Sequence, residues 1–275
     1  MPLKLENNLA NQGIFGLIGS PVAHSLSPLM WNSAFSALAY PAVYLAFEVA
    51  ESSLKEAFNG LSALGIKGIN VTRPYKSAVA GLCETLIGPA AKLIAVNTVK
   101  FGSGKIIGYN TDAIAFKTIL KPFCEGKNAL ILGNGDTAMA AAWALAQSHI
   151  GQVSVISRRE TPVPDFFASP KIFFWADWNS KNLQHALRTA DLVINTTPLG
   201  WKQEDKIPEL ETGLNKQQIF FDVNYGKNSQ LTEAAVKNGC RVIDGRELLL
   251  LQAMESFRLL TELEPPEKIM RSCIF

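Results

Sequence analysis

The sequence predicts a two-lobed α/β protein, and three observations lead to this fold class. The chain has 275 residues, which at about 100–200 residues per domain is enough for two domains. From Ile14 onward, short apolar strands alternate with amphipathic helices, an order typical of right-handed βαβ units and a mostly parallel sheet. Near Lys127 the series starts again, with an apolar strand, a glycine-rich turn and an alanine-rich helix. We therefore expect two α/β lobes in succession.

The N-terminal lobe begins with a strand at 14–19 that opens into a loop rich in proline and hydroxyl groups. Pro28 suits the first position of a helix over 28–38, and Ser27 suits its N-cap, a role that leaves Ser25 unexplained. The later elements are expected at 43–47 (strand), 52–64 (helix), 66–71 (strand), 95–101 and 105–109 (hairpin) and 113–120 (helix). Ligands of such sheets bind beyond the carboxyl ends of the strands.

The run 65–76 combines a buried-looking strand with a polar end. Pro74 cannot donate to a strand ladder, so the strand should end at Thr72. Lys76 should then fall in the first turn of the element that follows, where the helix dipole disfavours a cation. Lys76 is therefore either a solvated surface residue or is held by a carboxylate from elsewhere in the chain.

Polar residues also follow or begin the arms of the expected hairpin. Asn97 lies on the first arm, and Asp112 comes just after the second. Asp112 stands directly before an apolar-periodic segment, so it is equally well interpreted as a helix N-cap or as a functional carboxylate. Both roles require the ionised form.

Composition and charge exclude several classes of partner. The chain has 26 basic and 24 acidic residues, a net charge of +2 and no basic block, so we expect neither nucleic acid nor a membrane surface as a partner. No signal peptide is apparent, and the most apolar stretch, 37–47, is too short to span a membrane. The cysteines fit neither a metal-binding spacing nor a disulfide framework. We therefore expect a cytoplasmic protein without a metal site, in which four cysteines are reduced thiols: Cys83, Cys124, Cys240 and Cys273.

The second lobe begins with an apolar strand, a glycine turn and a helix, the order found in dinucleotide sites. Gly133 allows the tight turn, Gly135 lets the backbone approach a pyrophosphate, and Ala138 is small enough for close helix packing. These features predict a Rossmann-type dinucleotide-binding domain. Its cofactor loop comprises Gly133, Asn134, Gly135, Asp136, Thr137 and Ala138.

Later strand ends supply further cofactor and ligand candidates. After the strand at 152–156, the chain offers Ser157, Arg158 and Arg159 where an NAD site would have an acidic residue. Arginines and a hydroxyl suit the 2′-phosphate of NADP, although solvated surface arginines are the alternative. Two more strands, at 192–195 and 220–223, end in polar or small residues. We expect the residues that follow these two strands to lie beside the bound cofactor. They are Thr196, Thr197, Pro198 and Tyr225.

Taken together, these motifs resemble the shikimate dehydrogenase family over nearly the whole chain. Each string is common by itself, whereas their order and spacing are highly specific. The motifs that carry the resemblance are His24-Ser25-Leu26-Ser27-Pro28, Asn70-Val71-Thr72-Arg73-Pro74-Tyr75-Lys76, Ala95-Val96-Asn97-Thr98, Gly108-Tyr109-Asn110-Thr111-Asp112, Asn195-Thr196-Thr197-Pro198-Leu199-Gly200, Asp222-Val223-Asn224-Tyr225 and Gln252-Ala253.

The resemblance implies NADPH-dependent reduction of 3-dehydroshikimate to shikimate in the aromatic amino-acid and chorismate route. It implies Lys76 and Asp112 as the catalytic pair. An ammonium and a carboxylate suit this chemistry, because hydride transfer to a ketone leaves an alkoxide that needs a proton. The substrate's hydroxyls and carboxylate would be held by Ser25, Ser27, Thr72, Asn97, Tyr225 and Gln252, with Asp112.

Several alternatives stay open on sequence grounds. The chain could be a quinate/shikimate dehydrogenase that uses NAD, or a non-catalytic sensor of such hydroxy acids on the same fold. The protein could be a monomer or a homodimer. We expect a substrate and catalytic domain over 1–112, completed by a C-terminal helical segment at 246–275, and an NADP-binding Rossmann-like domain over 113–245.

Overall fold

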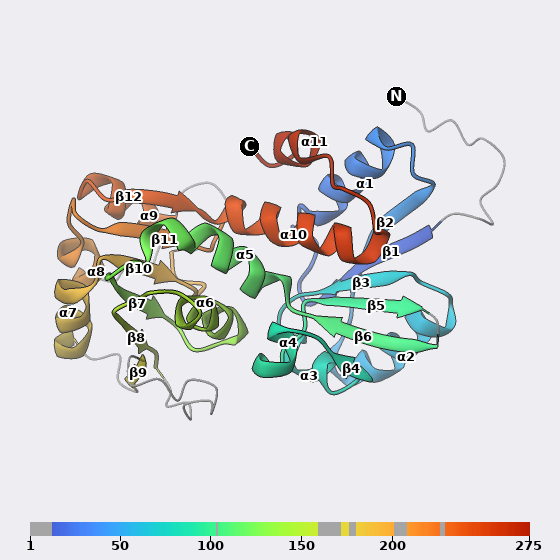
Figure 1. Ribbon diagram of the computed structural model, residues 1–275, viewed down its shortest axis with the longest axis horizontal. Helices are drawn as coiled ribbons and strands as arrows, with labels where there is room; N and C mark the ends of the chain where they lie inside the picture. Colours follow the sequence, from blue (N-terminus) through green and yellow to red (C-terminus); the bar gives the residue numbers. More distant parts are fainter. Residues whose placement is uncertain (1–12, 103, 159–171, 176–179, 201–207, 226–228) are drawn as a thin grey trace. The chain divides into compact units, whose positions relative to one another are not determined.

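The computed structural model describes residues 13–102, 104–158, 172–175, 180–200, 208–225 and 229–275 (Figure 1). The chain divides into two compact units. Unit 1 comprises residues 1–110 and 253–275, and unit 2 comprises residues 111–252. Each unit is built around a six-stranded sheet, which confirms the predicted two-lobed α/β fold.

Unit 1 contains a mixed sheet in the order β2-β1-β3-β5-β6-β4. Strands β1, β2 and β3 are parallel, whereas β5 is antiparallel to both β3 and β6. The strands are β1 (Gly13–Gly19), β2 (Ala42–Glu48), β3 (Gly68–Val71), β4 (Thr85–Leu86), β5 (Thr98–Gly102) and β6 (Lys105–Tyr109). The helices are α1 (Ser27–Ala37), α2 (Leu54–Ala63), α3 (Lys76–Ala80), α4 (Pro89–Leu93) and α11 (Glu267–Ser272), with a 3-10 turn at Glu51–Ser53.

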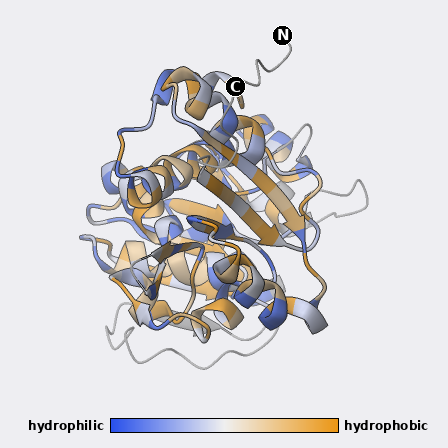
Figure 2. Ribbon diagram, turned by 90° about the vertical axis from the view of Figure 1, so that its right-hand side faces the viewer, coloured by the Kyte–Doolittle hydropathy of each residue, from blue (hydrophilic) through white to orange (hydrophobic). Residues whose placement is uncertain are grey.

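Two hydrophobic layers cover this sheet. On one face, Phe58 of α2 and Val79 of α3 join Ile18 and Ile69 in a single buried cluster. Another cluster is aromatic: Trp31 stacks on Tyr44 and also contacts Phe15, Phe35 and Phe257. Figure 2 shows how strongly hydrophobic residues concentrate in the strands. These layers follow from the near-continuous apolar runs of strands that are covered on both faces.

Unit 2 contains an all-parallel sheet in the order β9-β8-β7-β10-β11-β12. The strands are β7 (Asn128–Leu132), β8 (Gln152–Ile156), β9 (Ile172–Trp175), β10 (Leu192–Asn195), β11 (Ile219–Asp222) and β12 (Arg241–Asp244). Numbered along the chain, this order is 3-2-1-4-5-6, that of a Rossmann fold. The helices are α5 (Thr111–Leu120), α6 (Asp136–Ala146), α7 (Ser180–Thr189), α8 (Pro208–Gly213) and α9 (Gln230–Lys237), with a 3-10 turn at Lys121–Phe123.

Helices pack against the sheet of unit 2 as expected for parallel strands. Helices α7, α8 and α9 supply Leu187, Leu210 and Leu231 to one cluster with Leu130 of β7. Helix α5 packs on α6, and its Phe116 ring meets the Phe221 ring of β11. The chain enters unit 2 at the start of α5 and leaves it within α10 (Gly245–Thr261). In the part of the chain that the structure describes, no helix is long and apolar enough to cross a membrane.

Candidate active site

In unit 1, several loops with polar side chains leave the same edge of the sheet. The register places the ends of β1 and β3 side by side, since Ile18 lies opposite Val71. The amino end of β5 lies at this edge too, because Thr98 is paired with both Asn70 of β3 and Tyr109 of β6. The loops after β1, β3 and β6 and the residues before β5 therefore start from one place.

Backbone hydrogen bonds join these loops. The Ser20 N–H donates to the Arg73 carbonyl at 3.0 Å, and the Thr72 N–H donates to the Ile18 carbonyl at 2.9 Å. The Lys76 carbonyl accepts from the Val96 N–H, also at 2.9 Å. The loop that carries Thr72 and Lys76 is thus tied both to the end of β1 and to the segment just before β5.

Lys76 is the first residue of α3, as the proline signal predicted. Its residue exposure is only 8%. An ammonium group is costly to bury unless polar groups surround it. The alternative interpretation of Lys76 as a solvated surface lysine is therefore wrong.

The two serines of the first loop are arranged differently from the prediction. Helix α1 begins at Ser27, and Leu26 occupies the N-cap position without a side-chain cap. The Ser25 Oγ accepts from the Ser27 N–H at 3.2 Å. The expected N-cap role of Ser27 is therefore wrong, because the hydroxyl two residues earlier satisfies a first-turn N–H. Ser27 is 7% exposed.

Asn97 is held by a buried polar network. Thr98 Oγ1 lies 3.2 Å from Asn97 Oδ1 and must donate, because an amide oxygen can only accept. Asn70 Nδ2 lies 3.1 Å from Thr98 Oγ1 and 2.7 Å from Oγ of Ser256 on α10. The Tyr44 hydroxyl donates to Asn70 Oδ1 at 2.8 Å. These contacts fix the orientation of the Asn97 amide so that Nδ2, its donor, points away from Thr98.

The remaining predicted substrate residues belong to unit 2. Asp112 is 7% exposed and lies inside the first turn of α5, which begins at Thr111, so the N-cap alternative is wrong. Tyr225 follows β11 by three residues and is half-buried. Gln252 is half-buried as well, and its Nε2 donates to the Leu249 carbonyl of its own helix at 2.9 Å.

The predicted cofactor loop lies at the switch point of the Rossmann sheet, between β7 and β10. Gly133 has φ +105°, which side chains other than glycine's rarely adopt. A Cβ at this position would lie 2.8 Å from Oγ1 of Thr196, the first residue after β10. The Thr196 hydroxyl in turn donates to the Leu132 carbonyl at 2.6 Å. The loops after β7 and β10 are therefore in close contact where a dinucleotide would lie.

The N-terminus of α6 suits a pyrophosphate. Gly135 is the N-cap residue and forms no side-chain cap, so no side chain of the cap occupies the first N–H groups of the helix. Ala138 is fully buried, as close packing requires. Asp136 is the first helical residue and not the cap. Asn134 and Thr137 lie in the same turn, half-buried.

The end of β8 supplies the residues predicted to recognise the 2′-phosphate. Ser157 is 6% exposed, whereas Arg158 is exposed. Arg159 lies outside the described residues. From the loop after β10, Thr197 is half-buried and Pro198 exposed.

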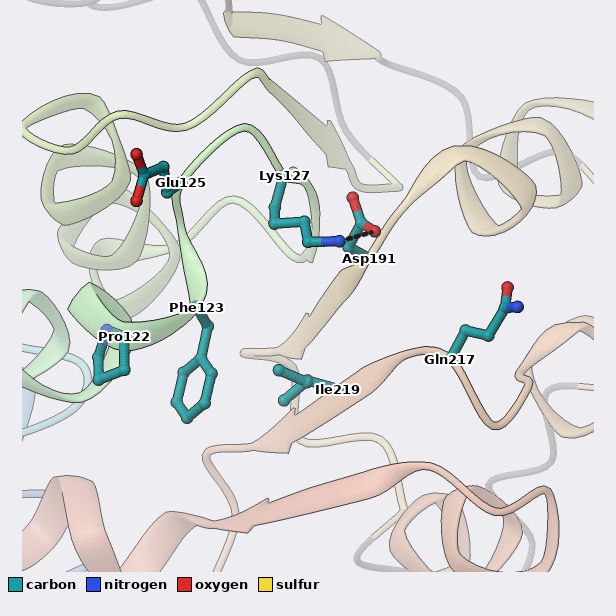
Figure 3. A pocket seen from close by; sticks show the side chains of 7 residues that line it. All are labelled: Pro122, Phe123, Glu125, Lys127, Asp191, Gln217 and Ile219. Atoms are coloured by element: carbon teal, nitrogen blue, oxygen red, sulfur yellow. Dashed lines mark hydrogen bonds and ion pairs between the residues drawn. The ribbon is translucent and has the colours of Figure 1, made fainter.

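A cavity of about 200 Å³ lies at the opposite edge of the Rossmann sheet (Figure 3). Asp191 and Ile219, at the starts of β10 and β11, line it together with Lys127. In Figure 3 the side chains of Lys127 and Asp191 point toward each other, and their Nζ and Oδ1 atoms are 3.1 Å apart. Because dinucleotides bind at the carboxyl ends of the strands, this cavity is not the predicted cofactor site.

Sequence reasoning missed a buried polar cluster at the carboxyl ends of β10 and β11. Asp222 is 2% exposed, and Asn195 is fully buried. Their side chains meet at 3.1 Å between Nδ2 and Oδ1. The available signal was the polar last residue of each otherwise apolar strand, since a polar group placed there is buried only when it has partners.

Comparisons with known proteins agree with this arrangement. The family model "Shikimate dehydrogenase substrate binding domain" matches residues 17–99. "Shikimate dehydrogenase (NADP(+))" of Thermococcus kodakarensis is 38% identical over 95% of this chain and 96% of its own length. The crystal structure of the Aquifex aeolicus shikimate dehydrogenase aligns with a TM-score of 0.85 at 33% identity, covering 96% of this chain and 98% of that one. That of the Thermus thermophilus shikimate 5-dehydrogenase, in complex with NADP(H) and shikimate, aligns with a TM-score of 0.83 at 28% identity, covering 96% and 98%. With relatives this similar over nearly its whole length, the chain belongs to the shikimate dehydrogenase family.

Proposed function

We propose that this protein catalyses the reversible, NADPH-dependent reduction of 3-dehydroshikimate to shikimate. The observation that carries the proposal is the buried Lys76, an acid placed at the sheet edge where the Ser25 and Thr72 loops and Asn97 converge. The Thermococcus kodakarensis protein, which is 38% identical to this chain, is named "Shikimate dehydrogenase (NADP(+))". A cytoplasmic setting is consistent with four free cysteines, which are Cys83, Cys124, Cys240 and Cys273.

Each polar residue then has a role in the reaction. The Lys76 ammonium donates a proton to the alkoxide that develops on the ketone oxygen, and in the reverse direction its amine takes that proton back. Asp112 is the carboxylate partner of Lys76 in the catalytic pair, and it accepts a hydrogen bond from the adjacent substrate hydroxyl. The other hydroxyls and the carboxylate of the substrate are bound by Ser25, Ser27, Thr72, Asn97, Tyr225 and Gln252.

The residues of unit 2 fit NADP. Bound NADPH supplies the hydride. The first N–H groups of α6 bind its pyrophosphate, with Gly133 and Gly135 allowing close approach of the backbone. Ser157 and Arg158 bind the 2′-phosphate, with Arg159 as a further candidate. Thr196, Thr197 and Pro198 bind near the nicotinamide.

The test is steady-state oxidation of shikimate with NADP+ by the Lys76→Ala variant. Loss of the acid should lower kcat by about a thousandfold or more, which corresponds to a transition-state loss of about 4 kcal/mol. Lys67→Ala is the matched control, because Lys67 is exposed in the same stretch of chain and should keep wild-type turnover. Near-normal turnover by Lys76→Ala would contradict the proposed role.

Two further measurements separate the alternatives. Catalytic efficiencies with NAD and NADP should favour NADP, because the residue after Ile156 is a serine rather than an acid. The same measurement with quinate and shikimate should favour shikimate if the proposed function holds. A non-catalytic sensor would bind shikimate without oxidising it and would not bind NADPH in a fluorescence titration. Sedimentation of the same samples would decide between monomer and homodimer.

A further inference from the structure

The carboxylate of Asp222 is the centre of a buried hydrogen-bond cluster in unit 2 that has no assigned role. It is the last residue of β11 and is 2% exposed. Two of its donors come from helix α9 and the residue before it: the hydroxyls of Ser229 at 2.6 Å and Thr232 at 3.1 Å. The other donors come from the ends of β10 and β11. They are Asn195 Nδ2 at 3.1 Å, the Asn224 N–H at 3.1 Å and Asn224 Nδ2 at 3.0 Å.

The second group of donors leads to the loop after β10. Asn195 Oδ1 accepts from both the N–H and the hydroxyl of Thr197, at 3.1 and 2.7 Å. Asn224 Nδ2 donates to the Thr197 carbonyl at 2.8 Å. The two amides that contact Asp222 therefore hold Thr197 by its N–H, its carbonyl and its side chain.

The far end of the same loop also rests on this cluster. Gly200 has φ +95°, and a Cβ there would lie 2.8 Å from the Ser229 Oγ that donates to Asp222. Hydrogen bonds from Asn195 and Asn224 thus hold the 196–200 loop, and at Gly200 its backbone comes so close to the Ser229 hydroxyl that a side chain would not fit.

A carboxylate suits this position for a chemical reason. Ionised aspartate only accepts hydrogen bonds, and five donors surround Asp222. A pure acceptor forces Asn195 to direct its NH2 toward Asp222, which turns its Oδ1 toward Thr197. An amide at position 222 would add two donors and remove one acceptor, so Asn195 could flip and release Thr197.

We propose that Asp222 is a positioning residue that sets the conformation of the 196–200 loop and thereby the affinity for NADP(H). The inference rests on the proposed function, because it takes Thr196, Thr197 and Pro198 to bind the cofactor. Asp222 itself contacts neither cofactor nor substrate in this assignment. It acts through the orientation of Asn195 and Asn224.

The test compares NADPH affinity, measured by fluorescence titration, in the full-length wild type and in Asp222→Asn. We expect the Kd of the variant to rise at least about tenfold, or about 1.4 kcal/mol. The KM for NADP+ should rise in parallel, while kcat at saturating cofactor changes by less than about threefold. A residue that merely stabilised the fold would lower the unfolding temperature and leave this Kd unchanged in the folded protein.

Thr232→Val is the matched control, because it removes a donor to Asp222 from α9 and leaves the Asn195 and Asn224 contacts intact. It should lower the unfolding temperature but bind NADPH like the wild type. Asn224→Ala provides a second test if Asp222→Asn does not fold, and it should raise the Kd about threefold or more. A wild-type Kd in whichever of these two variants folds overturns the inference alone. Failure of the wild type to bind NADPH overturns the proposed function and this inference with it.

Discussion

The side-chain amide of Asn32 forms hydrogen bonds with both backbone groups of Tyr44. Its Oδ1 accepts from the Tyr44 N–H at 2.9 Å, and its Nδ2 donates to the Tyr44 carbonyl at 2.9 Å. Strand β2, which contains Tyr44, is the outermost strand of its sheet. The amide of Asn32 thus takes the place that a neighbouring strand would have, and it protects an apolar edge strand that could otherwise pair with another chain.

Asn32→Ala should therefore destabilise the protein and promote self-association. Loss of both hydrogen bonds leaves the Tyr44 backbone groups unsatisfied, at a cost of about 1–3 kcal/mol in the free energy of unfolding. Urea denaturation measures this loss, and light scattering at increasing protein concentration measures the association. Asn59→Ala is the control, because Asn59 is exposed on α2 and should change stability by less than about 0.5 kcal/mol. Equal stability of the two variants would refute this role for Asn32.

Thr98→Val should weaken shikimate binding. Valine fills nearly the same space but has no hydroxyl to donate to Asn97 Oδ1 or to accept from Asn70 Nδ2, so the Asn97 amide loses its fixed orientation. We expect the KM for shikimate to rise about fivefold to tenfold, about 1 kcal/mol, the usual worth of one hydrogen bond. The KM for NADP+ should stay the same. Thr98→Ser retains the donor and should restore a KM close to that of the wild type, and an equal increase in both variants would indicate a packing effect instead.

Gly133→Ala should impair cofactor binding selectively. The substitution forces a side chain into φ +105° and brings its Cβ to 2.8 Å from the Thr196 hydroxyl, so the loops after β7 and β10 must move apart. Isothermal titration should show weaker NADP+ binding by tenfold or more, with shikimate binding unchanged. Gly60→Ala serves as the control. Gly60 lies in α2 with open space around its Cβ position, so this change should be neutral or slightly stabilising.

Stability should depend on pH through Asp222. Burial raises the pKa of Asp222 above its ordinary value of 3.8, although hydrogen bonds from Ser229, Asn224, Thr232 and Asn195 partly oppose this. Folded Asp222 therefore binds a proton more tightly than the unfolded chain does. Its contribution to the free energy of unfolding is largest at low pH and is lost as the pH rises from about 4 through the folded pKa.

Urea denaturation of the wild type and of Asp222→Asn at several pH values measures this contribution. As the pH rises from about 4 through the folded pKa of Asp222, the free energy of unfolding of the wild type should fall relative to that of Asp222→Asn. A difference that is constant with pH would show that Asp222 has an unperturbed pKa.

Much of the fold was predictable because its signals are local. Strands β1, β7 and β10 are mainly apolar runs that end in, or are followed by, glycine or a polar residue, and Pro74 correctly placed Lys76 in the first turn of α3. Strand β9 was missed because it lies in a segment rich in proline and aromatic residues with no regular period.

The wrong and missing predictions at the site concern contacts that cannot be inferred from neighbouring residues in the sequence. Ser27 fits every rule for an N-cap, yet the hydroxyl of Ser25 bonds the first-turn N–H instead. The Asp222 cluster unites side chains from the ends of two strands and from α9. The polar last residues of β10 and β11 indicate buried partners, but no spacing in the chain identifies those partners, because only the parallel pairing of β10 with β11 brings the members together.

Unit 1 is made of two segments separated by the whole of unit 2. Phe257, which packs against Trp31 and Phe35, belongs to the second segment. During synthesis, all of unit 2 is therefore made before Phe257, which completes the aromatic cluster of unit 1. Unit 2 can fold during translation, as contiguous domains generally do. Unit 1 cannot complete its aromatic cluster until Phe257 has been synthesised, so a nascent chain that stops before Ala253 leaves Trp31 and Phe35 without this packing partner.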